Sequence, residues 1–142
     1  MAELDFRKLH ILLIDDEAFM RSLVERALNE IGVEIVTSAE NGRQGLEKLK
    51  GSRRPVDLVI CDLEMPEMDG LGFVKAMRSD DQISVSKIPV LILTGHAEEE
   101  TVYDAVKLGI NGYLVKPISK NSLEKRLIAA IKNPTLNPGN SA

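Results

Sequence analysis

The chain has 142 residues, of which 44% are hydrophobic and 28% charged, and its formal net charge is −4 at pH 7. This size and composition fit one globular domain, and the acidic balance argues against direct binding to the phosphate backbone of nucleic acid. The single cysteine excludes an internal disulfide, and no apolar run approaches the roughly 18 residues of a membrane span. We therefore expect a cytoplasmic protein without membrane insertion.

Short apolar runs alternate with amphipathic stretches along the chain. Most runs are continuously apolar, which is typical of strands buried on both faces of a parallel sheet, and the stretches between them have the spacing of helices with one apolar stripe. In chain order the sequence predicts a strand at 10–14, a helix from Met20 to Ile31, a strand at 33–37, a helix at 42–50, a strand at 56–61, a helix after Asp69, a strand at 89–93, a helix before Gly109, a strand at 113–115 and a helix that starts near Ser119 or Asn121 and ends before Pro134.

Glycine and asparagine residues mark several predicted boundaries. Gly32 and Gly109 are expected to end the first and fourth helices, and Asn41 is expected to cap the second. Gly45 lies inside the second helix, where it costs up to about 1 kcal/mol relative to alanine. The second strand alternates polar and apolar residues, so we expect it at an edge of the sheet, and we expect the polar segment 79–87 to be a long loop.

Five strands that alternate with five helices predict an α/β domain of three layers. Parallel strands need crossover connections, and the crossover helices then cover the sheet. We expect this domain to span residues 9–132, after an N-terminal extension at 1–8 and before a flexible C-terminal tail at 133–142 that contains two prolines and a glycine.

Polar residues stand where four of the predicted strands end. Asp15 and Asp16 follow the first strand, Asp62 the third, Thr94 the fourth and Lys116 the fifth. In open α/β sheets, ligands bind outside the carboxyl ends of the strands. We therefore expect three carboxylates, a hydroxyl and an ammonium to meet at one edge of the sheet.

Each of these residues also has an ordinary structural role. An aspartate can cap a helix or shape a turn, a threonine fits a strand, and a lysine is common on surfaces. Three carboxylates at adjacent strand ends would repel one another, however, and a divalent cation removes that conflict. Mg²⁺ suits such a site because it binds few protein oxygens and keeps positions for water and phosphate. Thr94 and Lys116 could then contact a phosphoryl group, and Asp62 could accept it as a nucleophile.

These residues, together with the segment DLEMPEMDG at 62–70, resemble the receiver domains of two-component response regulators, of the CheY-like single-domain type. The resemblance extends over residues 9–132 and includes the pair Lys116 and Pro117. It implies a flavodoxin-like, doubly wound sheet of five parallel strands in the order 2-1-3-4-5, with five flanking helices. It also implies a cis peptide bond before Pro117.

The resemblance implies a role for each site residue. Asp62 would be the phosphoacceptor, and Thr94 and Lys116 would contact the phosphoryl group. Phosphorylation would move Thr94 and Tyr113, and would alter the protein contacts of the surface formed by the fourth predicted helix, the fifth strand and the fifth helix. The Mg²⁺ ligands would be Asp15, Asp16, Asp62 and the backbone carbonyl of Glu64.

The same resemblance implies protein partners rather than a metabolic substrate. The chain would take its phosphoryl group from a histidine kinase or a phosphotransfer protein, act on an unknown downstream protein, and catalyse only its own phosphorylation and dephosphorylation. We expect a monomer or a homodimer linked to phosphorylation. Nothing after Lys132 is long enough for an output domain, so we expect a stand-alone receiver or one excised from a longer chain.

Two other functions are compatible with parts of the pattern. A Mg²⁺-dependent phosphatase of the haloacid dehalogenase type also uses an aspartate nucleophile, a hydroxyl side chain, a lysine and an acidic pair. In that class the nucleophile comes first and a second aspartate lies two residues later, where this chain has Glu64. A scaffold that acts independently of phosphorylation would keep the fold without the chemistry, and the full acidic set argues against it.

Overall fold

A computed structural model of the chain describes residues 4–65, 67–95 and 100–132. Residues 1–3 of the predicted extension, Pro66 and the predicted tail at 133–142 lie outside this part. In chain order, the elements are η1 (Phe6–Lys8), β1 (His10–Ile14), α1 (Ala18–Ile31), β2 (Ile35–Ala39), α2 (Gly42–Gly51), β3 (Leu58–Asp62), α3 (Gly70–Arg78), α4 (Ile83–Ser86), β4 (Val90–Thr94), α5 (Glu100–Leu108), β5 (Gly112–Val115) and α6 (Lys120–Lys132).

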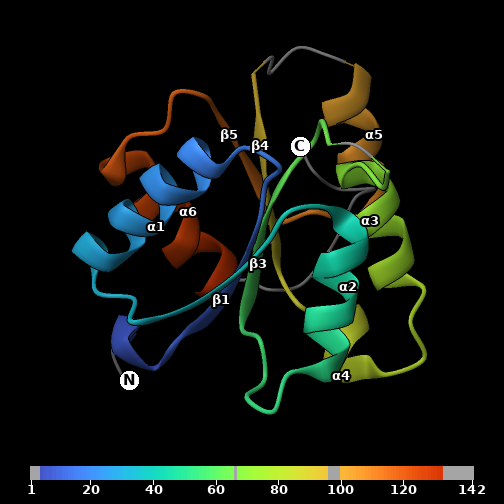
Figure 1. The fold of residues 1–142 in the computed structure, drawn as a ribbon, viewed down its shortest axis with the longest axis horizontal. Coiled ribbons are helices and arrows are strands. Elements are labelled where there is room, and N and C mark those ends of the chain that lie inside the picture. Colours follow the sequence, from blue (N-terminus) through green and yellow to red (C-terminus); the bar gives the residue numbers. More distant parts are fainter. Residues whose placement is uncertain (1–3, 66, 96–99, 133–142) are drawn as a thin grey trace.

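The five strands form one parallel sheet in the order β2-β1-β3-β4-β5, as predicted. Helices α1 and α6 cover one face of the sheet, and α2, α3 and α5 cover the other, so that the domain has three layers (Figure 1). The chain passes from β1 to β2 on one side and returns to β3 on the other, which places the switch in strand order between β1 and β3. Within the described residues, no helix is both long and apolar enough to cross a bilayer.

Consecutive residues of the central strands enter two separate cores. Ile11 and Leu13 of β1 pack among residues of α1 and α6. Leu12 and Ile14 pack among residues of α2, α3 and α5, and all four side chains are fully buried. Because successive side chains of a strand point to opposite faces, and both faces are covered, the strand sequences are continuously apolar.

Strand β2 begins two residues later than predicted. Gly32 ends α1 with a φ of 125°, and the backbone N–H groups of Gly32 and Val33 both donate to the carbonyl of Leu28. Val33 is fully buried in the core beside α1. Residues 33 and 34 therefore complete the end of the helix, and pairing with β1 starts at Ile35.

The segment 79–87 is not the long loop that we predicted, because it contains the short helix α4. Asp80 Oδ1 accepts a hydrogen bond from the N–H of Gln82, and the carbonyl of Gln82 accepts from Val85 and Ser86. Val85 is buried in the core beside α3. Burial of this one apolar side chain stabilises a helical turn that the polar composition of the segment does not indicate.

Arg78, at the end of α3, joins that helix to the segments on either side of β4. Its guanidinium donates hydrogen bonds to the backbone carbonyls of Gly109, Ser86 and Ile88, at 3.0, 2.9 and 2.6 Å. Burial lowers the pKa of Arg78 to about 10, so the side chain is still protonated at neutral pH. A partly buried cation thus satisfies three carbonyl groups from two parts of the chain.

We expect Arg78→Met to lower the free energy of unfolding by about 2 kcal/mol, because several buried carbonyls lose a charged donor. Arg78→Lys should also destabilise the protein, since one ammonium cannot reproduce the planar arrangement of the guanidinium. Urea unfolding followed by circular dichroism measures both changes. A lysine variant as stable as the wild type would show that charge alone, and not this geometry, is needed.

Candidate functional site

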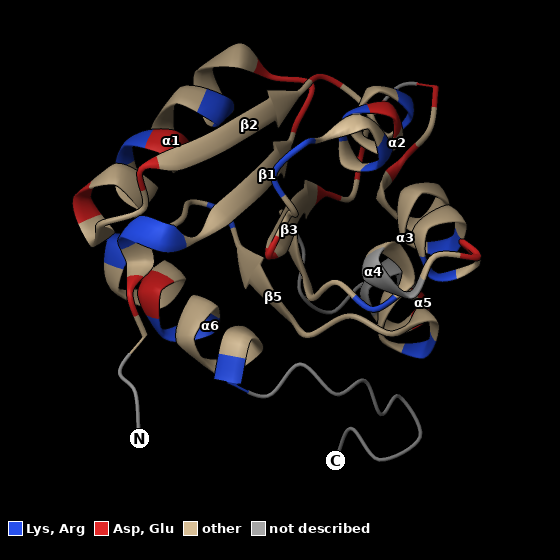
Figure 2. Ribbon diagram, turned by 90° about the horizontal axis from the view of Figure 1, so that it is seen from below, with Lys and Arg blue, Asp and Glu red and all other residues tan. Residues whose placement is uncertain are grey.

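The ends of four strands bring the predicted site residues to the carboxyl edge of the sheet. Asp15 and Asp16 directly follow β1, Asp62 and Thr94 are the last residues of β3 and β4, and Lys116 directly follows β5. Figure 2 shows the acidic residues that follow β1 and β2 at this edge. Because Asp62 and Thr94 are paired within the sheet, the backbone ladder holds their positions more rigidly than a loop would.

The three aspartates form a compact carboxylate cluster. Asp15, Asp16 and Asp62 each offer one carboxylate oxygen, and these oxygens all lie within 4.8 Å of one another. Asp15 is fully buried and Asp62 is 5% exposed, whereas Asp16 faces solvent. Asp15 Oδ2 has no hydrogen-bond partner among the described residues, although it is buried. Since buried carboxylate oxygens normally have a partner, this arrangement fits a hard cation.

Lys116 contacts the cluster with its ammonium group. Its Nζ lies 3.3 Å from Asp62 Oδ1, 3.5 Å from Asp15 Oδ2 and 3.9 Å from Glu17 Oε1. Burial lowers the pKa of Lys116, but the negative charges of Asp62 and Asp15 outweigh that effect, and the net shift is upward. Lys116 therefore stays charged, and one ammonium offsets only part of the negative charge around it.

Asp62 lies in surroundings that disfavour its charged form. Burial, and then the charge of Asp15, raise the pKa of Asp62 to about 6, although Lys116 opposes the rise. The preceding residue, Cys61, is fully buried in the core on the α3 side, and burial raises the pKa of its thiol well above the usual value. At neutral pH the site thus holds an ionised Asp62 in repulsive contact with Asp15, and an unreactive thiol beside it.

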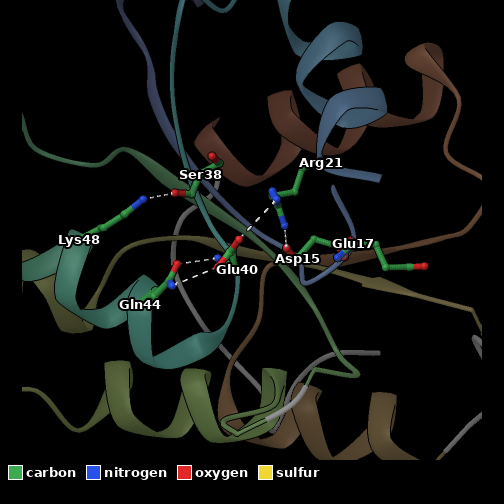
Figure 3. Close-up of polar contacts among 7 residues, drawn as sticks. All are labelled: Asp15, Glu17, Arg21, Ser38, Glu40, Gln44 and Lys48. Atoms are coloured by element: carbon green, nitrogen blue, oxygen red, sulfur yellow. Dashed lines mark hydrogen bonds and ion pairs between the residues drawn. The ribbon is translucent and has the colours of Figure 1, made fainter. Parts of the chain in front are cut away.

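Hydrogen bonds to the backbone and side chain of Asp15 fix its position. Its N–H donates to the carbonyl of Ala39 at 3.1 Å, and its Oδ1 accepts from the N–H of Glu17 at 2.9 Å. Its carbonyl accepts from Arg21 Nη1 at 2.7 Å, and Arg21 also pairs with Glu40 at 3.9 Å (Figure 3). The helical periodicity assigns Arg21 only to the polar face of α1, so nothing in the sequence indicates that it links this aspartate to the segment before α2.

An open pocket of about 350 Å³ lies over the cluster. This volume is large enough for a phosphoryl group and several water molecules. Three of the lining residues, Glu17, Leu63 and Gly95, were not predicted as site residues from the sequence. Leu63 and Gly95 carry no reactive group, and Glu17 has the position of a residue at the start of a helix. The lining consists of Asp16, Glu17, Asp62, Leu63, Glu64, Thr94, Gly95 and Lys116.

Of the remaining predicted site residues, Glu64 lines the pocket, whereas Pro117 and Tyr113 do not. Glu64 lines it, and its side chain is exposed. The peptide bond between Lys116 and Pro117 is cis. Tyr113 does not line this pocket; it is partly buried against the core on the α3 side and borders a separate hollow with Arg126 of α6.

The family model of the response regulator receiver domain matches residues 11–128, a range that contains all the residues of the pocket. The chain belongs to this family. The receiver is 36% identical over 117 residues to the chemotaxis protein CheY1 of Helicobacter pylori, and the match covers 82% of this chain and 92% of the relative. Its fold is similar to the solved structure of CheY4 of Vibrio cholerae, with a TM-score of 0.76 at 34% identity over 84% of this chain and 96% of the other. A receiver domain protein from Clostridium thermocellum gives a TM-score of 0.78 at 28% identity, over 87% of this chain and 94% of the other.

Membership in this family defines the general function of the chain. Receiver domains are signalling switches of two-component systems, in which an aspartate is phosphorylated, and they are not enzymes that turn over an external substrate. The family match therefore supports the receiver switch over the phosphatase and the scaffold, the two other functions that the sequence left open.

Proposed function

We propose that this receiver is a Mg²⁺-dependent switch whose phosphoacceptor is Asp62. The observation that carries the proposal is the carboxylate cluster, in which the buried Asp15 Oδ2 lacks a hydrogen-bond partner among the described residues. When bound, Mg²⁺ would supply positive charge for the oxygens of the phosphoryl group. The residues that would hold it are Asp15, Asp16, Asp62 and Glu64, the last through its backbone carbonyl.

Asp62 is the aspartate best placed to receive the phosphoryl group. It lies at the end of a hydrogen-bonded strand and lines the open pocket, whereas Asp15 is fully buried beneath it. In the transfer, a carboxylate oxygen of Asp62 forms a bond to phosphorus. The bond between phosphorus and the donor's histidine nitrogen breaks, and its electron pair stays on the imidazole. No other co-reactant is needed.

Lys116 and Thr94 would stabilise the transferred group. The ammonium of Lys116 is already within 3.3 Å of Asp62 Oδ1, so it can pair with a phosphoryl oxygen attached there. Thr94 ends the neighbouring strand and lines the same pocket, where its hydroxyl can donate to another phosphoryl oxygen. These two contacts form only when the phosphoryl group is present, and they therefore distinguish the two states of the switch.

The surface formed by α5, β5 and α6 is the proposed output surface. Thr94 is in register with Val115 of β5, and Tyr113 lies two residues earlier on the same strand. A shift of Thr94 toward the phosphoryl group would change the space available to Tyr113. Val115 is 43% exposed and Tyr103 of α5 is 63% exposed, so a downstream protein would find apolar and aromatic groups on this surface.

The proposed donor is a histidine kinase or a phosphotransfer protein in the cytoplasm. The relatives are named as chemotaxis proteins, which supports a signalling role that depends on protein contacts. The output partner would be another protein, because the exposed residues of the proposed output surface, Tyr103 and Val115, lie outside the pocket.

Incubation with Mg²⁺ and acetyl phosphate, followed by intact-mass measurement and an assay for inorganic phosphate, tests the proposed function. One phosphoryl group per chain, absent when EDTA is added, is the expected result. Sustained hydrolysis of an unactivated phosphate monoester such as p-nitrophenyl phosphate would instead support the phosphatase, and an unchanged mass with both acetyl phosphate and phosphoramidate would support the scaffold.

A further inference from the structure

Glu17 lies at the mouth of the pocket, and its side chain does not cap the helix that follows it. It immediately precedes α1, where the side chain of the N-cap residue commonly accepts a hydrogen bond from the first helical turn. Glu17 makes no such bond. Its Oε1 instead lies 3.9 Å from Lys116 Nζ, and its side chain is 65% exposed. Figure 3 shows this side chain extending away from the contacts that join Arg21 to Glu40.

Lys116 therefore has three carboxylate neighbours before any phosphoryl group arrives. Two of them, Asp15 and Asp62, belong to the cluster that fits a cation. Glu17 is not part of that cluster, and it places a negative charge on the solvent side of the ammonium that an incoming phosphate must approach. The contact is weak in energy because it is exposed, but its charge still acts on other ions at the mouth.

The residues around the pocket carry an excess of negative charge, so each carboxylate adds to the repulsion of an approaching anion. Five carboxylates and one ammonium surround it, counting the buried Asp15. Negative charges still outnumber positive ones when a divalent cation is present. A donor is then repelled in proportion to its own negative charge, and the repulsion weakens as salt is added.

We propose that Glu17 is a specificity-determining residue that discriminates among phosphodonors by charge and disfavours small dianionic acyl phosphates. This inference rests on the proposed role of Asp62 as phosphoacceptor. A donor protein offsets the repulsion with contacts outside the pocket, which a small molecule cannot make. Glu17 would thus favour phosphorylation by the signalling partner over phosphorylation by acyl phosphates in solution.

Two small donors that carry different charges transfer the same phosphoryl group to Asp62, so they can be used to test whether the charge of the donor matters. With acetyl phosphate, a dianion at pH 7.5, an oxygen of Asp62 bonds to phosphorus and the bond to the acetyl oxygen breaks, so that acetate leaves with the electron pair. With phosphoramidate, which carries one net negative charge as its zwitterion, the bond from phosphorus to nitrogen breaks and ammonia leaves with the electron pair. The product on Asp62 is identical, but the donors differ in leaving group as well as in charge. The leaving group of each donor is the same for the wild type and the variant, so the ratio of variant rate to wild-type rate for each donor isolates the effect of charge.

The test compares initial rates of adduct formation, by intact mass at saturating Mg²⁺, for the wild type and Glu17→Gln. Loss of one negative charge at the mouth should raise the rate with acetyl phosphate about fivefold and the rate with phosphoramidate about twofold, and added salt should reduce both gains. Glu17→Asp keeps the charge and should stay within about twofold of the wild type with both donors. Glu25→Gln is the matched control for net charge, because Glu25 is an exposed residue of α1, the helix that follows Glu17, and does not line the pocket.

An equal rate gain with the two donors would overturn the proposal, because the gain would then not depend on the charge of the donor. A rate gain in Glu25→Gln equal to that in Glu17→Gln would also overturn it, because the position of the charge at the mouth would then not matter. Glu17→Gln should fold normally, since no capping bond is lost, and its thermal unfolding verifies this. If the wild type forms no adduct with either donor, the role of Asp62 fails as well. If the wild type is phosphorylated but the variant shows no charge-dependent gain, only the role of Glu17 fails.

Discussion

Asp62→Asn should abolish the phosphoryl adduct and leave the fold intact. An amide does not attack phosphorus as a carboxylate does, and the cluster also loses one of the three oxygens that fit a cation. We expect no increase in mass after incubation with Mg²⁺ and either small donor, under conditions that load the wild type with one phosphoryl group. Circular dichroism should show the same secondary structure in both proteins.

Asp81→Asn is the matched control for this variant, because Asp81 is exposed and does not line the pocket. It should be phosphorylated at the rate of the wild type. An adduct of normal stoichiometry on Asp62→Asn would mean that another aspartate accepts the group. Peptide mapping of that adduct would then identify the true acceptor, with Asp16 the first candidate since it also lines the pocket.

Without metal, Asp62→Asn should be more stable than the wild type by about 3 kcal/mol at pH 7.5, because each unit of pKa shift corresponds to about 1.4 kcal/mol. The pKa of Asp62 rises from its usual 3.8 to about 6 on folding, so the folded protein binds this proton more tightly than the unfolded chain does. The resulting stability is fully present below pH 3.8 and is lost as the pH rises through 6. The asparagine variant has no such group and does not lose this contribution.

Urea unfolding in EDTA at several pH values measures this difference between the two proteins. Other carboxyl groups contribute with the opposite sign, as at Asp80, where hydrogen bonds from Gln82 and Lys50 lower the pKa. They cancel when the variant is compared with the wild type at each pH. The difference should approach zero below about pH 4 and should shrink again when Mg²⁺ is added at pH 7.5, since a ligand that binds only the folded state stabilises it. A difference that does not change with pH would show that charge repulsion is not its cause.

The fold and most of the predicted site follow from local patterns. Continuous apolar runs gave the strands because both faces of the sheet are covered, and the polar residue after each run marked the edge where ligands bind. The predicted cap is confirmed, since Asn41 accepts a hydrogen bond from the N–H of Gln44. Asp69, after which the third helix was predicted to begin, accepts one from the N–H of Gly72. These features depend on residues that are close together in the chain, so they can be predicted from the sequence.

Glycine shows the limit of such local reasoning. Gly45 is unfavourable by helix propensity, but a Cβ atom there would lie 2.4 Å from Ile14 Cδ1 and 3.2 Å from Phe73 Cε1. At Gly70, a Cβ atom would lie 2.5 Å from the carbonyl oxygen of Asp62. Gly70 faces backbone atoms, which cannot move aside, whereas a Cβ atom at Gly45 would require the end of the Ile14 side chain to shift. In both cases the close approach is a property of the packed domain.

The sequence by itself determined the order of the five strands and of the five longer helices, the edge of the sheet that carries the site, and the residue types that meet there. Only the tertiary structure decided that Arg21 holds Asp15 and that Glu17 turns toward Lys116. It also decided that, among the described residues, the buried Asp15 Oδ2 has no hydrogen bond and only a 3.5 Å ion pair with Lys116. The physical reason is that periodicity and capping act over a few residues of the chain. The charge balance of a pocket depends on distances between side chains from separate strands, which exist only once those strands are packed together.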